Sequence, residues 1–279
     1  MKQNIVALSF GAGVQSTALL MLIINRDERL VEAMDGISEL PTCVIFADPG
    51  AETNKTYQHV DIMKERAEDS GLKFVHVNGG SLTDQIELGR IDLPLFIKDL
   101  AGNVSILRRS CTNNHKIIPI KRALRDLMGY KPKQHVKHHA DVWIGISLDE
   151  IQRMKESSNK WETKHFPLIE MEWRRSDCIN YLNKIGLRHV GKSACVYCPF
   201  HNDRNWLDLK RNYPEEFLEA CRIDEMVRNY ANHPGSKLKN VEGLYIHKTG
   251  TPLRDVELGE NQTELFDMFD NECDGMCGL

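Results

Sequence analysis

Short apolar runs alternate along the first half of the chain with longer stretches in which apolar positions recur every three or four residues. Four of the runs indicate buried β-strands: residues 4–8, 42–47, 73–77 and 142–146. Three stretches have a helical pattern: residues 17–24, 53–70 and 115–128. This alternation predicts βαβ units and a Rossmann-like α/β fold, with a mostly parallel sheet, helices on both faces and ligands at the carboxyl ends of the strands.

From about Arg174 the pattern becomes mostly helical, and a loop that contains two cysteines interrupts it. We therefore predict two parts: residues 1–173 as an α/β domain, and residues 174–279 as a mostly helical region with a cysteine loop and a cysteine-rich tail. We expect the tail to be mobile, since it contains glycine and shows little periodicity.

The N-terminus lacks a cleavage site, and no apolar run reaches membrane-spanning length. We therefore expect a cytoplasmic protein without a membrane partner. The net charge of −4 excludes a global positive field that would attract nucleic acid.

A basic segment stands out against this acidic background. Residues 105–139 carry nine lysines and arginines but one acid, Asp126. The segment indicates either a surface along which phosphates bind or a basic helix face exposed to solvent. On the first interpretation, the expected nucleic-acid contacts are Arg108, Arg109, Lys121 and Arg122.

A glycine-rich loop follows the first predicted strand. Gly11 and Gly13 precede Ser16 and Thr17, which open a helix. Glycines let backbone amides approach an oxyanion, and hydroxyls with a helix N-terminus add donors and positive dipole. The spacing fits neither a Walker A loop nor GxGxxG. A tight βα turn without a ligand is the alternative interpretation.

Five segments, in order along the chain, resemble the PP-loop ATP pyrophosphatase superfamily, and within it the phosphoadenosine-phosphosulfate (PAPS) reductase-like branch. The DNA-phosphorothioation ATP pyrophosphatases of this branch are similar too. The segments are GAGVQST (11–17), VIFADPGAETNKTY (44–57), RRSCTNNHKIIPI (108–120), WIGISLDEIQRMK (143–155) and ECDGMCGL (272–279). The chain departs from the family's SGGxDS loop, because Gly11 replaces its first Ser and Gln15 replaces its Asp.

The resemblance implies a nucleotide site in residues 1–173, for ATP with Mg²⁺. The residues expected to bind the nucleotide are Ser9, Phe10, Gly11, Ala12, Gly13, Gln15, Ser16, Thr17, Asp48 and Gly145. Lys116 and Arg153 are expected to face the phosphates or the leaving pyrophosphate. The alternatives are a turn or helix-cap role for Asp48 and a solvated helix face for Arg153.

The loop Cys195–Cys198 is a Cys-x-x-Cys followed by proline. Two thiolates at this spacing can bind one metal or cluster, so a redox dithiol, structural zinc and an iron–sulfur cluster all remain open. The resemblance favours a [4Fe-4S] cluster held by Cys111, Cys195 and Cys198. Ser110 stands where related cluster-bearing reductases have a further cysteine. Three cysteines would leave one iron open, as in tRNA-thiolating PP-loop enzymes.

Two more cysteines, Cys273 and Cys277, lie within the last seven residues. Reductases of the branch use a tail cysteine as nucleophile, so the resemblance implies that one of these thiols carries sulfur as a persulfide. The alternatives are a fourth cluster ligand and an unimportant terminal thiol.

The resemblance thus implies an ATP pyrophosphatase that adenylates an acceptor for sulfur insertion, with nucleic acid (a DNA backbone or a tRNA base) as the expected acceptor. A sulfur donor such as a cysteine desulfurase is an expected partner, and a homodimer or a multi-subunit modification complex an expected assembly. A PAPS- or adenylylsulfate-reductase-like thiol enzyme is the second interpretation. A non-enzymatic Fe–S nucleotide sensor or assembly subunit is the third.

Overall fold

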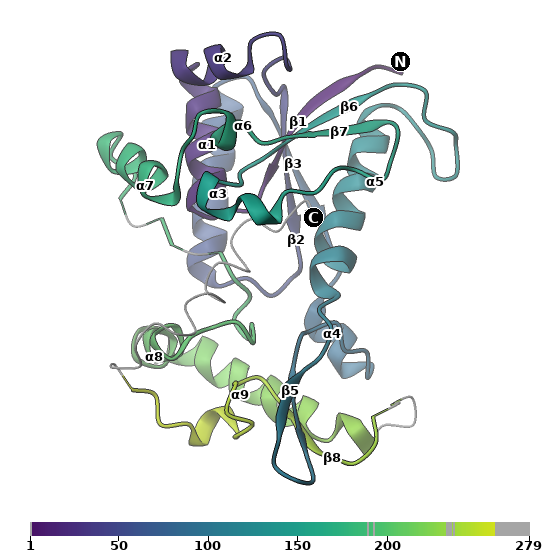
Figure 1. Cartoon of the computed structure of the whole chain (residues 1–279), viewed down its shortest axis with the longest axis vertical. Coiled ribbons are helices and arrows are strands. Elements are labelled where there is room, and N and C mark those ends of the chain that lie inside the picture. The colour runs from purple at the N-terminus through teal and green to yellow at the C-terminus, as the bar shows by residue number, and fades with distance from the viewer. Residues whose placement is uncertain (1, 189, 192, 233–235, 237, 260–279) are drawn as a thin grey trace.

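The computed structural model describes residues 2–188, 190–191, 193–232, 236 and 238–259 (Figure 1). Its centre is a sheet of five parallel strands in the order β3-β2-β1-β6-β7. The strands are β1 (Ile5–Phe10), β2 (Cys43–Asp48), β3 (Lys73–Asn78), β6 (Ala140–Ile144) and β7 (Glu162–His165). The predicted Rossmann-like α/β fold is confirmed. Of these five strands, β7 alone was not predicted, because its sequence is polar and gives no hydrophobic pattern.

The strand order places a topological switch point beside β1. The chain leaves β1 for β2 on one side and later returns to pair β6 on the other side. In open α/β sheets, ligands bind at the carboxyl ends of strands at such a point. The loop after β1 and the residues after β6 therefore lie where a ligand is expected.

Helices cover both faces of this sheet. Leu8 and Phe10 belong to one apolar cluster and Ala7 to another, because successive strand residues point to opposite faces. The first cluster involves α1 (Val14–Ile24), α2 (Glu28–Met34), α3 (Asn54–Asp69), α6 (Pro167–Glu170) and α7 (Arg175–Lys184). The second contains α5 (Ile118–Leu127), which a π-helix (Asn113–Ile117) precedes.

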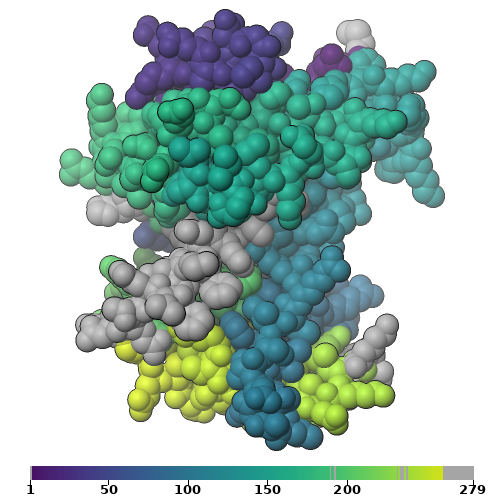
Figure 2. All heavy atoms as spheres, viewed as in Figure 1, coloured from purple at the N-terminus to yellow at the C-terminus, as the bar shows by residue number. Residues whose placement is uncertain are grey.

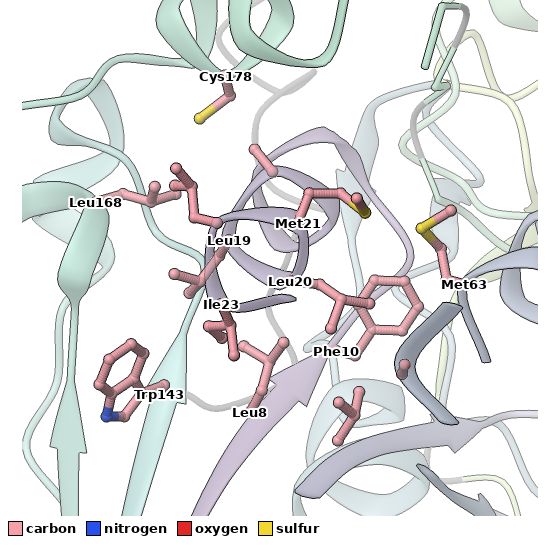
Figure 3. Packing of buried hydrophobic residues seen from close by; sticks show 14 of the residues in the cluster. Leu8, Phe10, Leu19, Leu20, Met21, Ile23, Met63, Trp143, Leu168 and Cys178 are labelled. Atoms are coloured by element: carbon pink, nitrogen blue, oxygen red, sulfur yellow. The ribbon is translucent and has the colours of Figure 1, made fainter. Parts of the chain in front are cut away.

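Helix α1 is enclosed by the core. Every residue from Val14 to Ile23 is buried, and the helix is apolar on nearly all sides, as a fully buried helix requires. Figure 3 shows Leu19, Leu20 and Ile23 among side chains of β1 and β6. Helix α1 begins three residues before the predicted start at Thr17. The side chains packed around α1 hold the N-terminus of this helix in place at the carboxyl end of β1.

A second sheet lies at the other end of the molecule and is antiparallel, in the order β5-β4-β8. Its strands are β4 (Phe96–Asp99), β5 (Val104–Ile106) and β8 (Val241–Tyr245). In Figure 2, the blue spheres of β4 and β5 lie beside the yellow and yellow-green spheres of the C-terminal part. The helices in this part of the molecule are α4 (Leu82–Glu87), α8 (Asp203–Asn212) and α9 (Pro214–Arg228).

Short 3-10 segments of the whole described structure span Leu148–Arg153, Tyr230–Asn232 and Leu253–Asp255.

Packing crosses the predicted boundary between residues 173 and 174 in both directions. Helix α7 lies beyond that boundary, yet Cys178 and Leu182 join the apolar cluster around α1. Conversely, Leu93 and Leu95 lie before it and pack with residues of α8 and α9. The boundary itself stays a prediction. Among the described residues, no helix combines the length and the apolar character needed to cross a membrane.

Candidate functional site

The loop between β1 and α1 presents the N-terminus of a buried helix at the switch point. Ala12 has a φ of 59°, a left-handed conformation that costs a non-glycine residue about 1–3 kcal/mol and is concentrated at functional sites. Gly13 is the N-cap of α1, with no side chain to cap it, and the first turn contains no acid. The backbone N–H of Gly13 donates to Ser16 Oγ at 3.2 Å. The positive end of α1 is thus left for an external anion.

The segment after β6 packs directly against this loop. A Cβ atom added to Gly145 would lie 2.8 Å from the backbone N of Ser16, so only glycine allows this approach. The buried amide of Gln15 donates to Ser147 Oγ at 3.4 Å and accepts from Arg175 Nη1 at 2.9 Å. Arg175 begins α7 and was missed by the sequence reasoning, because nothing in its local sequence links it to residue 15.

His59 on α3 reaches the same loop from the opposite side. A hydrogen bond of 2.8 Å joins its Nε2 to Thr17 Oγ1. Burial lowers the pKa of His59 from 6.5 to about 4, with a smaller contribution from Arg66. The imidazole is therefore neutral at pH 7 and orients the Thr17 hydroxyl without adding charge. This residue, too, was missed.

Asp48 closes the turn after β2. Its Oδ1 accepts hydrogen bonds from the Gly50 N–H at 2.7 Å and from the Tyr57 hydroxyl at 2.8 Å. Its Oδ2 lies 3.1 Å from His76 Nε2. Burial and, next, the bond to Asp48 raise the pKa of Tyr57. The turn role considered for Asp48 is therefore present, and its contact with a nucleotide stays a prediction.

The two cations expected at the phosphates both contact acids. Arg153 Nη1 lies 2.6 Å from Glu150 Oε1, and both side chains are buried. The alternative interpretation of Arg153 as a solvated helix residue is therefore wrong. Lys116 Nζ lies 3.0 Å from Oε1 of the buried Glu52, whose Oε2 accepts from Ser193 Oγ at 3.2 Å. A phosphate role for either cation stays a prediction.

The structure brings Cys111, Cys195 and Cys198 to the wall of one small cavity, of about 30 Å³, which we call the thiol cavity. Its other lining residues are Pro49, Leu82, Leu93, Pro94, Arg109, Thr112, Lys116, Ala194 and Phe200. The cysteine loop docks on the segment after β2, because Val196 N–H donates to the Ala51 carbonyl at 2.8 Å. The Cys198 N–H donates to the Cys195 carbonyl at 3.0 Å and closes the turn.

Asp92 anchors the segment that carries Cys111. Its backbone carbonyl accepts from the N–H groups of Ser110 and Cys111, at 3.1 and 2.9 Å. Its carboxylate accepts from Ser110 Oγ at 2.8 Å and bonds to His115 Nε2 at 3.0 Å. Ser110 is thus held toward Asp92, which fits a set of three cysteines rather than four ligands from these two loops.

Three thiols at one cavity form a soft donor set, which suits an iron–sulfur cluster or zinc. Within the ranges that the structure describes, however, no group of three or more Cys, His, Asp or Glu side chains is arranged to hold a metal ion. The metal site therefore stays a prediction. Cys273 and Cys277 lie outside the described residues.

The four basic residues expected to contact nucleic acid do not share one surface. Arg109 faces the thiol cavity, where its Nε donates to Thr112 Oγ1 at 2.9 Å and its guanidinium lies 5.5 Å from the Phe200 ring centroid. Lys121 Nζ lies 3.7 Å from Glu162. Arg122 lines a different cavity, between β3 and α5. Arg108 is exposed. A single phosphate track therefore has no support from their placement.

A larger cavity, of about 180 Å³, opens between α3, α8 and α9, and we call it the α3–α9 pocket. It borders the β1–α1 loop at Ala12 and shares Ala194 with the thiol cavity. Its other lining residues are Thr53, Lys55, Thr56, His59, Val190, Gly191, His201, Asn205, Asp208, Leu209, Tyr213 and Glu216. None of the three cysteines lines this pocket, and among the described residues Ala194 alone belongs to both linings.

Comparison with known proteins adds no assignment. No protein-family model matches the sequence, and no curated protein matches it significantly.

Proposed function

We propose that this chain is a PP-loop-type ATP pyrophosphatase that adenylates a nucleic-acid acceptor for sulfur insertion. One observation carries the proposal: an acid-free, uncapped helix N-terminus lies at the switch point of a parallel sheet, and the pocket beside its loop shares the wall residue Ala194 with a cavity that three cysteines line. The first feature suits polyphosphate binding, and the second suits sulfur chemistry at the same site.

In this proposal the backbone N–H groups at the start of α1 bind the phosphates of ATP, together with Mg²⁺. Gln15 and Thr17 keep fixed orientations, because Arg175 and His59 hold them. Preorganised donors of this kind stabilise the charge on the oxygens of the pentacoordinate α-phosphorus and on the leaving pyrophosphate. Arg175 is a positioning residue here, since it acts through Gln15.

The chemistry has two displacements and no net redox change. An oxygen of the acceptor attacks the α-phosphorus, and pyrophosphate leaves. Hydrosulfide from a sulfur donor then attacks the adenylated acceptor, and AMP leaves with the acceptor's oxygen. A cysteine desulfurase would deliver sulfur as a persulfide, and a second thiol would then have to release hydrosulfide from it with formation of a disulfide.

The three thiols of the thiol cavity would hold the predicted [4Fe-4S] cluster, and their donor chemistry fits it. When bound, the cluster would supply a place for inorganic sulfide. Lys116 and Arg109 line the same cavity.

The test is pyrophosphate release by the anaerobically purified full chain, with ATP, Mg²⁺ and sulfide, in the presence and absence of bulk tRNA and single-stranded DNA. We expect pyrophosphate and AMP in equal amounts, with nucleic acid stimulating their release. ADP and phosphate as products would overturn the proposal. Absence of any ATP cleavage under all these conditions would overturn it as well.

A further inference from the structure

Strand β3 forms one edge of the parallel sheet, and half of its main-chain groups point outward. At the two ends of this segment, the N–H groups of Lys73 and Gly79 donate to carbonyls of the β2 segment. Because successive residues of a strand bond to opposite sides, the odd-numbered residues from 73 to 79 bond to β2. The N–H and C=O groups of Phe74, His76 and Asn78 therefore face away from the sheet, where no further strand pairs with them among the described residues.

The two edges of this sheet differ in how well they resist pairing with another strand. Proteins usually protect an edge with a short strand, charged side chains, proline or a bulge. Strand β7, at the far edge, has four residues, and all of them are polar. Strand β3 has six residues, contains no proline and pairs with β2 without a bulge. Its one lysine is its first residue, so β3 is the edge to which a further strand can add.

A second copy of β3 fits this edge when it runs antiparallel, related by a twofold axis at His76. Every outward N–H then meets an outward C=O, because the outward-facing residues at positions 74 and 78 pair with each other and position 76 pairs with itself. On the face toward α5, Val75 lies opposite Val77 of the second copy, and symmetry repeats this apolar contact. Lys73, the only lysine, arginine or acid in β3, lies opposite Gly79. This edge is therefore complementary to itself.

Helix α5 adds a pair of charges that is complementary to itself in the same way. His115, just before α5, bonds through Nδ1 to the Gly79 carbonyl at 2.9 Å, so α5 begins beside the carboxyl end of β3 and runs back toward its amino end. Arg122 and Asp126 line the open groove between α5 and β3, are exposed, and form no ion pair among the described residues. Asp126 lies one turn further along the helix, so the twofold axis brings Arg122 of each copy toward Asp126 of the other. Helix α5 packs over β2, which would separate the two α5 axes by about 14 Å, three strand spacings, a gap that these two side chains can bridge.

We propose that two copies of this chain bind each other through β3, with the twofold axis at His76, so that their two five-stranded sheets become one continuous sheet. Main-chain hydrogen bonds hold the two strands together. The contacts between Val75 and Val77 and the ion pairs between Arg122 and Asp126 fix the register and the partner, since they form in this register on both sides of the axis. The inference is independent of the proposed function, because it uses no residue of the β1–α1 loop or of the thiol cavity.

The first test exchanges the charges on α5 and measures dimerisation of the full chain by sedimentation equilibrium, with a reductant so that no disulfide joins the copies. Arg122→Asp and Asp126→Arg each place like charges opposite each other twice, and we expect each to raise the Kd of the dimer about tenfold. The double variant restores opposite charges, and we expect the Kd of the unmodified chain. Lys137→Asp is the control, because Lys137 is exposed in the loop before β6, and we expect no change.

The second test reads the register from amide hydrogen exchange, resolved by residue with NMR, in dilute and in concentrated protein. The amides of Phe74, His76 and Asn78 should exchange fast in dilute protein and become protected as dimers form. The amides of Val75 and Val77 bond to β2 in each copy and should be protected at both concentrations. This alternation separates strand pairing from any other contact that buries the same surface.

Three results would each overturn the proposal. A chain that stays monomeric at every concentration would leave the β3 edge to an extended segment of another protein. A dimer that neither single charge exchange weakens, or that the double variant fails to restore, would have its interface elsewhere. A dimer in which the even-numbered amides of β3 gain no protection would not pair through this strand. None of these measurements involves ATP, so their failure leaves the proposed function untouched.

Discussion

The β1–α1 loop and the thiol cavity are built in opposite ways. The loop is one continuous segment, and the residues from Ser9 to Thr17 are all buried within the core. The cavity is assembled from segments far apart in the sequence, around residues 49, 93, 111 and 195, and its wall mixes charged and apolar groups. The first centre is therefore one local motif supported by tertiary contacts, whereas the second exists only through the docking of distant segments, so changes in one should leave the other intact.

The largest expected effect is a loss of ATP affinity at the β1–α1 loop, without a loss of thermal stability. Gly13→Asp places a carboxylate at the N-cap of α1, where it can cap the helix but repels phosphate. We expect at least a hundredfold loss of ATP affinity by calorimetry, an equal or higher Tm, and unchanged metal content. Gly13→Asn is the control, because a φ of −91° suits any residue and the asparagine side chain has the size of aspartate without its charge. Full ATP affinity in Gly13→Asp would place the nucleotide elsewhere.

The reciprocal change targets the thiol cavity. We expect Cys195→Ser or Cys111→Ser to remove most of the iron from anaerobically purified protein while ATP affinity changes less than about twofold. Iron and sulfide analysis with an absorbance spectrum measures this. Cys221→Ser is the control, because that thiol is buried within α9. A colourless unmodified protein with one tightly bound zinc would support the zinc alternative instead.

A smaller effect is expected where Gly145, after β6, approaches the β1–α1 loop. Gly145→Ala forces a Cβ within 2.8 Å of the Ser16 backbone, so the loop must shift. We expect about a tenfold loss of ATP affinity, by analogy with the cost of overpacking, about 1–3 kcal/mol. Gly259→Ala, where no atom of the described residues lies within 4 Å of the added Cβ, should bind ATP normally. Unchanged ATP affinity in Gly145→Ala would show that the loop does not depend on this approach.

The smallest effect concerns pH. Burial lowers the pKa of His59 from 6.5 to about 4, so between these values the unfolded chain takes up a proton that the folded chain refuses. The free energy of unfolding should therefore fall as pH drops from 6.5 toward 4. In His59→Gln this contribution is absent, and denaturant unfolding at several pH values should show a shallower decline. Identical slopes in both proteins would contradict a neutral, buried His59.

The contrast between the two centres also explains what the sequence could predict. Four strands and the loop were found because each is a contiguous pattern of apolar residues or glycines. The antiparallel sheet was not, since β5 is short and exposed and β4 pairs with β8 across more than half the chain, Phe96 with Tyr245.

Among the site residues, the resemblance indicated the three cysteines, and the structure then brought them to one cavity. Arg175 and His59 could not be predicted, because their contacts with Gln15 and Thr17 are made only by tertiary packing. Asp92 anchors the Cys111 segment in the same way, through bonds that span 18 or more positions.

The central claim is that ATP is cleaved between its α- and β-phosphates by attack of an acceptor oxygen. The most direct test is the mass spectrum of the nucleotide formed in water enriched in ¹⁸O, with ATP, Mg²⁺, sulfide and nucleic acid. The account predicts AMP without ¹⁸O, since its new oxygen comes from the acceptor. ADP as the product, or AMP that carries ¹⁸O from water, would contradict it.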